Sequence, residues 1–270
     1  MTSTMGKVWV IAKQTNRGLI RRRALAISVL YLTTVPVLVL LGGYVALGEE
    51  GLLVVHVGLA GITLAGLLVA IPAGIGLVRG ERERGLLQLL LARPVRRGEV
   101  VVGRFLGLAL TLFLLWSIMM AGLVILMEIG KALNGFPLAR PILWQAAMAV
   151  YLDLLLVSAL ALLLSLRTHP TVAAALTLLL YVVGRSSGEL LRWAESAPLA
   201  GVRLLFRGLF LFLPNFARLN WADEAAHAIP IPFSVMATAF LYTIFYLIVL
   251  LSGAALVFDR DQEDSSGLDG

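Results

Sequence analysis

The sequence predicts an all-α integral membrane protein, a bundle of six transmembrane helices, and three observations predict it. Hydrophobic residues make up 60% of the 270-residue chain and charged residues only 14%, whereas a soluble domain has about 45–50% apolar and about 25% charged residues. The apolar residues form long blocks, as membrane spans require. Within these blocks polar and apolar residues do not alternate, which excludes a β-barrel and leaves helices as the structure that pairs every backbone group in lipid.

Six apolar blocks are predicted to be the spans. They cover residues 24–47, 52–78, 105–127, 142–166, 171–184 and 233–258. The fifth block has about 14 residues, against the roughly 20 that a spanning helix needs, so we expect its helix to begin earlier or to tilt little. The whole chain, residues 1–270, is predicted to form a single transmembrane domain that ends in a polar tail at 259–270.

The basic residues indicate how the chain is oriented in the membrane. With the N-terminus inside, fifteen of the 22 Lys and Arg residues fall on the cytoplasmic side and seven on the other. Because cytoplasmic loops carry the excess of basic residues, both termini are predicted to be cytoplasmic, in the inner or plasma membrane. The formal charge of +6 follows from these span-flanking residues and does not indicate a nucleic-acid partner, and the absence of cysteine excludes disulfides and thiolate metal sites.

The connection between the fifth and sixth blocks, residues 185–232, is predicted to be extracytoplasmic. It contains an apolar piece, 199–213, that carries Arg203 and Arg207. Residues four apart lie on the same face of a helix, as in an amphipathic helix at a membrane surface. We therefore expect a re-entrant or interfacial helix here. The alternative is a seventh span, which would reverse the orientation of the last helix.

The segment between the second and third blocks, 79–104, is predicted to be a short cytoplasmic helix with basic flanks. Acidic residues open it, which suits the positive end of the helix dipole, and leucines cover a broad face over 81–91. Pro94 disfavours helix at the residue before it, so the helix ends near there, and Gly98 allows a turn. The physics alone leaves two interpretations open: a loop anchored by anionic lipid, or a docking helix.

The order of residues in this segment resembles that of the ABC type-2 permeases, including the subgroup related to the nitrous-oxide-reductase maturation permease. In that family two acids flanking one residue end the second span, followed by x-Gly, an apolar pair, an apolar helix, a Pro and a basic residue, and Gly-Lys/Arg opens the third span. The matching positions here are Glu81, Glu83, Gly85, Leu86, Leu87, Leu90, Pro94, Arg97, Gly103 and Arg104. The resemblance implies that this segment is the coupling helix, which docks into a groove of an ATP-binding subunit.

Two other regions resemble the family more loosely. The basic and apolar N-terminal stretch, 1–23, is similar to the family's interfacial connecting helix. The stretch 213–232, with Leu-Pro-Asn-Phe, a later His and Pro-Ile-Pro, is similar to the subgroup's pattern before the last span, although Ala228 stands where that pattern has Gly. The exit from the last span at 258–261 matches only in part.

The resemblance also implies the partners. No G-x-x-x-x-G-K-[ST] phosphate loop occurs in the sequence, so the chain does not bind ATP by that motif. ATP and Mg²⁺ would be bound by two copies of a separate ABC ATP-binding subunit, and this chain would be a transport subunit without a cofactor or catalytic centre. A second permease would complete the translocation path through the lipid, either a second copy of this chain in a homodimer or a related permease, and the family favours export or extraction from the membrane.

Asp153 lies near the middle of the fourth block. An ionisable residue at that depth is by default a functional-site hypothesis, here a polar residue of the translocation path. The alternative is a structural role, with a partner such as a Ser or Thr hydroxyl on a neighbouring helix or with the carboxyl group protonated. His56, near the start of the second block, is interpreted as an interfacial or bundle-facing residue, because His169 and His227 lie in distant loops and do not form a metal-ligand set with it.

Two functions of other classes are alternatives to an ATP-driven permease. A secondary transporter would be expected to show repeats and broken helices with buried charges, and Asp153 is the one central charge that the sequence offers. An intramembrane hydrolase would use Ser186 or Ser187 with His227. An ATPase subunit bound to the chain distinguishes the permease from both.

Overall fold

The computed structural model describes residues 19–43, 50–82, 97–134, 140–188, 192, 201, 203 and 214–266, and all regular elements in these parts are helices. They are α2 (Leu19–Gly43), α3 (Glu50–Arg82), α5 (Arg97–Asn134), α6 (Arg140–Arg167), α7 (Pro170–Arg185), the 3₁₀ helix η1 (Phe216–Leu219), α10 (Ala222–Ala226) and α11 (Phe233–Ser266). The prediction of an all-helical membrane fold is confirmed.

Six of these helices lie where the six spans are predicted. Four are long and apolar enough to cross a membrane, and these stretches are Gly51–Leu77, Val101–Ala132, Ile142–Arg167 and Phe233–Val257. The other two, Leu25–Val39 in α2 and Pro170–Arg185 in α7, are shorter apolar helices within the described residues. The count of six spans therefore stays a prediction.

Several helices extend beyond the predicted spans. Helix α5 begins at Arg97 and continues to Asn134, on both sides of the predicted 105–127. Helix α11 continues to Ser266, through much of the predicted polar tail. The reason is that an apolar block marks only the part of a helix that lies in lipid. Lys, Arg, Glu and Gln are good helix formers and continue the backbone hydrogen bonding into water.

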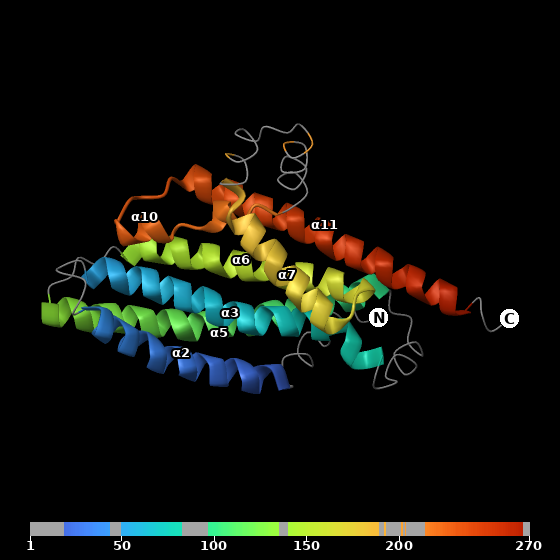
Figure 1. Ribbon diagram of the computed structural model, residues 1–270, viewed down its shortest axis with the longest axis horizontal. Helices are drawn as coiled ribbons and strands as arrows, with labels where there is room; N and C mark the ends of the chain where they lie inside the picture. Colours follow the sequence, from blue (N-terminus) through green and yellow to red (C-terminus); the bar gives the residue numbers. More distant parts are fainter. Residues whose placement is uncertain are drawn as a thin grey trace, which may run out of the picture.

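Helix α6 lies at the centre of the bundle (Figure 1). It packs against α3, α5, α7, η1, α10 and α11, and 78% of its apolar stretch is buried inside the chain. Helix α11 lies at the edge, where only 17% of its apolar stretch is buried, and α2 covers the opposite side of α3 and α5. Burial by the chain itself is therefore concentrated on α6, and the outer helices present apolar surface to their surroundings.

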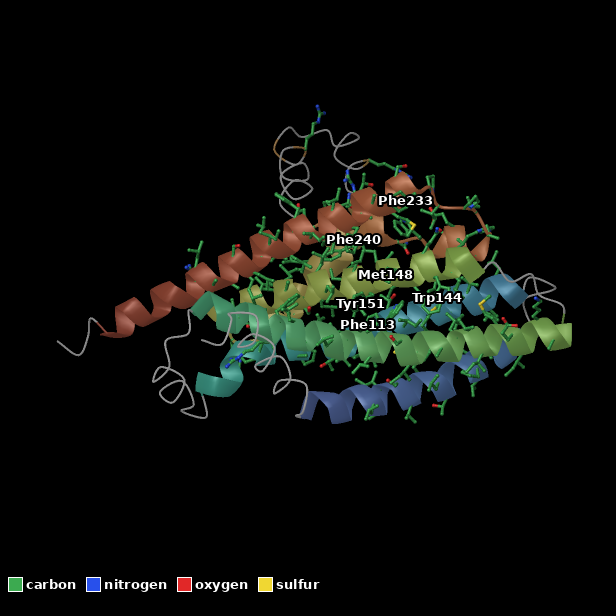
Figure 2. The ribbon with its side chains drawn as sticks, turned by 180° about the vertical axis from the view of Figure 1, so that it is seen from behind. Phe113, Trp144, Met148, Tyr151, Phe233 and Phe240 are labelled. Atoms are coloured by element: carbon green, nitrogen blue, oxygen red, sulfur yellow. The ribbon has the colours of Figure 1, made fainter. Side chains whose placement is uncertain are left out.

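The outer surface carries a group of aromatic side chains over α5, α6 and α11 (Figure 2). Phe113, Trp144 and Phe240 are 40%, 48% and 50% exposed. Beneath them, Trp116 Nε1 donates a hydrogen bond to Ala147 O at 2.7 Å, and Tyr151 OH donates to Ala109 O at 3.1 Å. These bonds satisfy the polar tips of two rings inside an apolar layer, as buried Trp and Tyr require, and they fasten α5 to α6.

Helices α3 and α6 approach closely at Gly74. A Cβ atom at this position would lie 2.5 Å from the backbone oxygen of Ser158 and 3.1 Å from Ala161 Cβ. Backbone cannot move aside as a flexible side chain can, so any larger residue would push the two helices apart. Gly76, two residues further along α3, has no such neighbour within 4 Å.

Replacing Gly74 with alanine is therefore expected to lower the free energy of unfolding by about 1–3 kcal/mol, the range for overpacking a tight contact. Gly76→Ala is the matched control, because it gains the same helix propensity, about 1 kcal/mol, without the clash. The measurement is thermal unfolding of both purified variants in one detergent, and Gly74→Ala should have the lower Tm. Equal Tm values would show that the two helices are not in tight contact there.

Helix α7 is much shorter than its neighbour α6, and this difference positions the candidate site. Thr168 and His169 form the turn between them, and the 16 residues of α7 run back beside 28-residue α6. Helix α7 therefore covers only about half of α6. From Pro214 onward the chain packs beside the other half, where η1 contacts α6 and α7, and α10 contacts α3 and α6 (Figure 1).

Candidate functional site

The C-terminal end of α7 meets the middle of α6 at an ion pair. Asp153 is fully buried, and its Oδ2 accepts hydrogen bonds from Arg185 Nη1 at 3.3 Å and from Tyr181 OH at 3.1 Å. Tyr181 and Arg185 are four residues apart, so both side chains lie on the face of α7 that meets α6. Asp153 is thirteen residues from Arg140 and fourteen from Arg167, about 20 Å from either end of the helix at 1.5 Å per residue.

Arg185 also connects this pair to the segment that follows α7. Its Nη2 donates to Asn220 Oδ1 at 2.8 Å, and its Nη1 donates to Tyr181 OH at 3.2 Å. The guanidinium thus contacts a carboxylate, a phenol and an amide in three different parts of the chain. Its planar fork of N–H donors suits such a junction, because the donors leave the head in fixed directions.

A second junction, at Asn215, extends the connections to α11. Asn215 Oδ1 accepts from Ser187 Oγ at 2.6 Å and from Arg218 N at 3.3 Å, which caps η1. Asn215 N donates to Tyr242 OH at 2.6 Å, and the Arg218 guanidinium lies 5.6 Å from the centre of the Tyr242 ring. Together these residues form what we call the α7-end network. It consists of Asp153, Tyr181, Arg185, Ser187, Asn215, Asn220 and Tyr242.

The electrostatics of the network depend on Arg185. A carboxylate without a partner is expensive to bury, whereas a pair of charges with further hydrogen bonds is tolerated. Oδ2 of Asp153 has two donors, but Oδ1 is buried without a hydrogen-bond partner among the described residues. Removal of Arg185 would therefore leave a buried carboxylate with a single phenol to stabilise it.

The network differs from what the sequence predicts for Asp153 in one respect. Its partners are a guanidinium and a phenol on α7, and not a Ser or Thr hydroxyl. No part of Asp153 is exposed on the surface of the single chain, so contact with a transported molecule would require a rearrangement. The role of Asp153 in a translocation path stays a prediction.

The residues of the rival hydrolase hypothesis have other partners. Ser187 Oγ donates to Asn215, and the His227 ring bonds through Nδ1 to Asp223 O at 2.9 Å. A nucleophile and a general base need a hydrogen bond between them. In the structure Ser187 and His227 instead bond to two other residues, Asn215 and Asp223. Among the described residues, no three His, Asp or Glu side chains come together in an arrangement that could hold a metal ion.

His56 connects α3 to α10. Its Nε2 lies 2.8 Å from Asp223 Oδ1 and its Nδ1 lies 3.1 Å from Leu52 O. His56 thus joins the start of α3 to α10, which agrees with the predicted interfacial or bundle-facing position.

The predicted coupling residues lie mostly outside the described residues. This holds for Glu83, Gly85, Leu86, Leu87, Leu90 and Pro94, while Glu81 falls in the last turn of α3 and Arg97 begins α5. Arg104 is described and is only 9% exposed, and its Nη1 donates to Leu77 O at 2.9 Å. Arg104 therefore joins α3 to α5 beside the coupling segment instead of facing outward.

The sequence does not predict that Arg185, Tyr181, Asn220 and Tyr242 form a group, although Asn220 falls within the stretch 213–232 that is similar to the subgroup's pattern. The sequence places Arg185 in the extracytoplasmic connection, because a charge at the end of an apolar block usually lies in water. The one local signal is a Tyr four residues before an Arg at the end of a span. The other partners of Arg185, Asp153 and Asn220, lie 32 and 35 residues away along the chain, so only the tertiary structure identifies them.

Comparisons with known proteins agree with the helical membrane architecture. The family model described as ABC-2 family transporter protein matches residues 8–262. A "Probable ABC transporter permease protein NosY" from Stutzerimonas stutzeri is 35% identical over 115 residues, which cover 41% of this chain and 41% of that protein. The protein of the same description from Pseudomonas aeruginosa is 36% identical over 115 residues, 41% of this chain and 42% of its own length. The match thus spans about two fifths of these relatives, and the family model spans nearly all of this chain: the chain belongs to the ABC-2 transporter family.

Proposed function

We propose that this chain is the membrane-spanning subunit of an ATP-driven exporter, in which two permease copies assemble with two separate ATP-binding subunits. The observation that carries the proposal is the family match over residues 8–262 on a chain that is helical and apolar in its described parts. The sequence contains no phosphate-loop motif, which supports an energy source outside the chain.

The coupling segment, 79–104, is the proposed contact with the ATP-binding subunit. It includes the end of α3, the connection that follows and the first turns of α5, and these two helices have 33 and 38 residues and extend beyond the apolar stretches. Two long helices joined at this end by the Arg104–Leu77 bond would move as a unit when the segment is pushed. Rigid-body switching of packed helices is a common way to convert a local displacement into a change at the far end of a bundle.

The α7-end network is the proposed latch of the extracytoplasmic half. It fastens the short helix α7 to α6 through Asp153, and to the 214–221 segment through Asn220. The far end of α3 contacts α10 of the same region through His56. A movement of α3 would therefore be transmitted directly to this region. Separation of Arg185 from Asp153 would then open the latch and expose Asp153 to the translocation path.

Co-purification from the source organism tests the proposal. An affinity-tagged chain is expected to retain an ATP-binding subunit, and the complex should hydrolyse ATP whereas the isolated chain should not. The control is the same chain purified after the complex has been dissociated. Substrate movement driven by the chain alone in liposomes, without ATP or a second protein, would instead show a secondary transporter.

A further inference from the structure

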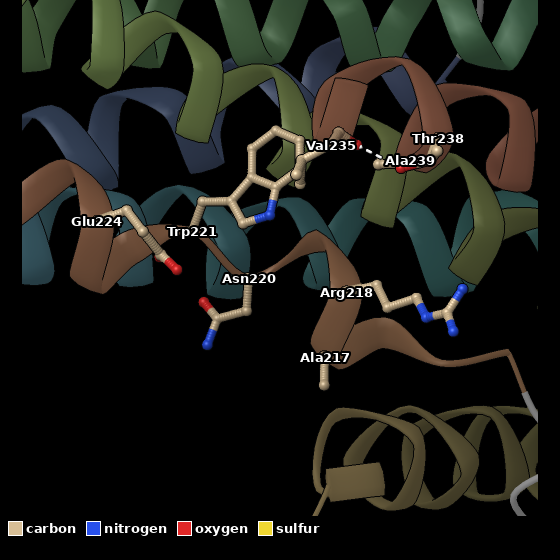
Figure 3. A pocket seen from close by; sticks show the side chains of 8 residues that line it. All are labelled: Ala217, Arg218, Asn220, Trp221, Glu224, Val235, Thr238 and Ala239. Carbon is tan, nitrogen blue, oxygen red and sulfur yellow. Dashed lines mark hydrogen bonds between the residues drawn. The ribbon is translucent and has the colours of Figure 1, made fainter. Parts of the chain in front are cut away.

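A cavity of about 370 Å³ lies between η1, α10 and the first turns of α11 (Figure 3). Its size is within the range of about 300–1,000 Å³ typical of small-molecule sites. It adjoins the α7-end network: Asn220 belongs to both, and Arg218, which lines the cavity, contacts Asn215 and Tyr242 of the network. In the predicted orientation it opens at the extracytoplasmic end of the bundle.

The cavity presents one cation and one anion that do not pair with each other. Arg218 and Glu224 both line it, and within the described residues the structure gives neither of them an ion pair. The one contact that it gives the Arg218 guanidinium is the face of the Tyr242 ring at 5.6 Å. Figure 3 shows Glu224 and Arg218 on opposite sides of Trp221. Together the two side chains complement a ligand that carries both a negative and a positive charge.

Neutral donors lie between the two charges. Asn220 Oδ1 is occupied by Arg185 Nη2, so the amide nitrogen of Asn220 is left to donate. Trp221 is 8% exposed, and its indole N–H is a donor only. These groups suit an acceptor-rich anion such as a phosphate, and the carboxylate of Glu224 suits an ammonium that can donate hydrogen bonds.

The remaining wall indicates a lipid as the carrier of the headgroup. Val235, Thr238 and Ala239 line the cavity from the first two turns of α11, the depth at which Trp and Arg side chains meet lipid headgroups. Below them α11 is largely uncovered, with Leu241 65% and Phe245 64% exposed. An acyl chain attached to a headgroup in the cavity can lie along this apolar face.

We propose that the cavity binds a zwitterion in which a phosphate is joined to a primary ammonium, as in phosphatidylethanolamine, with the phosphate at Arg218 and the ammonium at Glu224. The proposal concerns the chain alone and does not depend on the ATP-binding partner. The same chemistry occurs in soluble phosphoethanolamine, and the lipid is favoured because of the apolar face of α11.

Native mass spectrometry of the purified full chain in detergent tests the site with phosphatidylethanolamine and phosphatidylglycerol as probes. Arg218→Gln and Glu224→Gln are each expected to weaken binding of phosphatidylethanolamine at least tenfold. Binding of phosphatidylglycerol, which has no ammonium, should be weakened by Arg218→Gln alone. Arg167→Gln, which also removes one exposed positive charge but at the far end of α6, is the control and should bind both lipids like the parent chain.

Three outcomes would overturn the proposal. Full binding of phosphatidylethanolamine by Glu224→Gln would mean that the ammonium is not recognised, and an equal loss in Arg167→Gln would mean that binding is unspecific. Equal affinity for soluble phosphoethanolamine and for the lipid would reject the membrane as the source. Circular dichroism and size-exclusion profiles matching those of the parent chain show that a loss is not due to misfolding.

Discussion

Replacing Arg185 with glutamine is expected to lower the free energy of unfolding by about 3–5 kcal/mol, the range for breaking a buried pair and leaving one charge without its partner. The charge left behind is Asp153, which is fully buried and keeps only the Tyr181 hydroxyl as a donor to Oδ2. The same substitution removes the hydrogen bond to Asn220. Thermal or denaturant unfolding in a mild detergent measures the effect.

A double-mutant cycle provides the control. Asp153→Asn with Arg185→Gln removes both charges, so the double variant is expected to be more stable than Arg185→Gln alone, because the buried charge is gone. Tyr181→Phe removes one hydrogen bond and should cost only about 1 kcal/mol. If the effects of Asp153→Asn and Arg185→Gln simply add, the two side chains do not interact in the membrane-embedded protein, and the proposed latch is wrong.

Replacing Leu87 and Leu90 together with aspartate is expected to weaken assembly with the ATP-binding subunit by at least about a hundredfold. Each leucine that is buried in a docking groove contributes about 1.5–3 kcal/mol, and every 1.4 kcal/mol changes affinity about tenfold. The measurement is the amount of ATP-binding subunit retained by the tagged chain, together with the ATPase activity of the complex.

Gln88→Asp is the matched control for this pair. Gln88 is the one polar residue within the leucine run 86–91, and in a helix it does not share a face with Leu87, since adjacent residues point in different directions. This substitution adds a negative charge to the same segment, so an effect of negative charge alone would appear in both variants. If Gln88→Asp disrupts assembly as strongly as the leucine pair, the leucines do not form the docking face.

The sequence predicts the positions of the helices well because lipid imposes one simple requirement, a long apolar block. It predicts their ends poorly, as α5 and α11 show, because polar helix formers continue a helix into water without any apolar signal. The fifth block shows both the strength and the limit of this signal. The predicted stretch 171–184 agrees with the bounds of α7, Pro170–Arg185, but the helix begins only one residue earlier than predicted and stays shorter than a spanning helix needs.

The candidate site could be predicted only in part. Asp153 is identified from the sequence alone, because an ionisable residue in the middle of an apolar block demands an explanation. Its partner Arg185 is not, because the charge lies at a block's end and its contacts are made across the bundle. The coupling segment is predicted through a family resemblance. The resemblance includes Arg104, and the structure places that side chain between α3 and α5.

The central claim is that the segment between α3 and α5 faces the cytoplasm and contacts an ATP-binding subunit. The chain contains no cysteine, so Gln88→Cys introduces a single thiol without background. In intact cells a membrane-impermeant maleimide should leave this thiol unlabelled, and in inside-out vesicles a photo-crosslinker attached to it should capture the ATP-binding subunit. Labelling from outside the cell, or crosslinking in the purified complex that never includes an ATP-binding protein, would contradict the account.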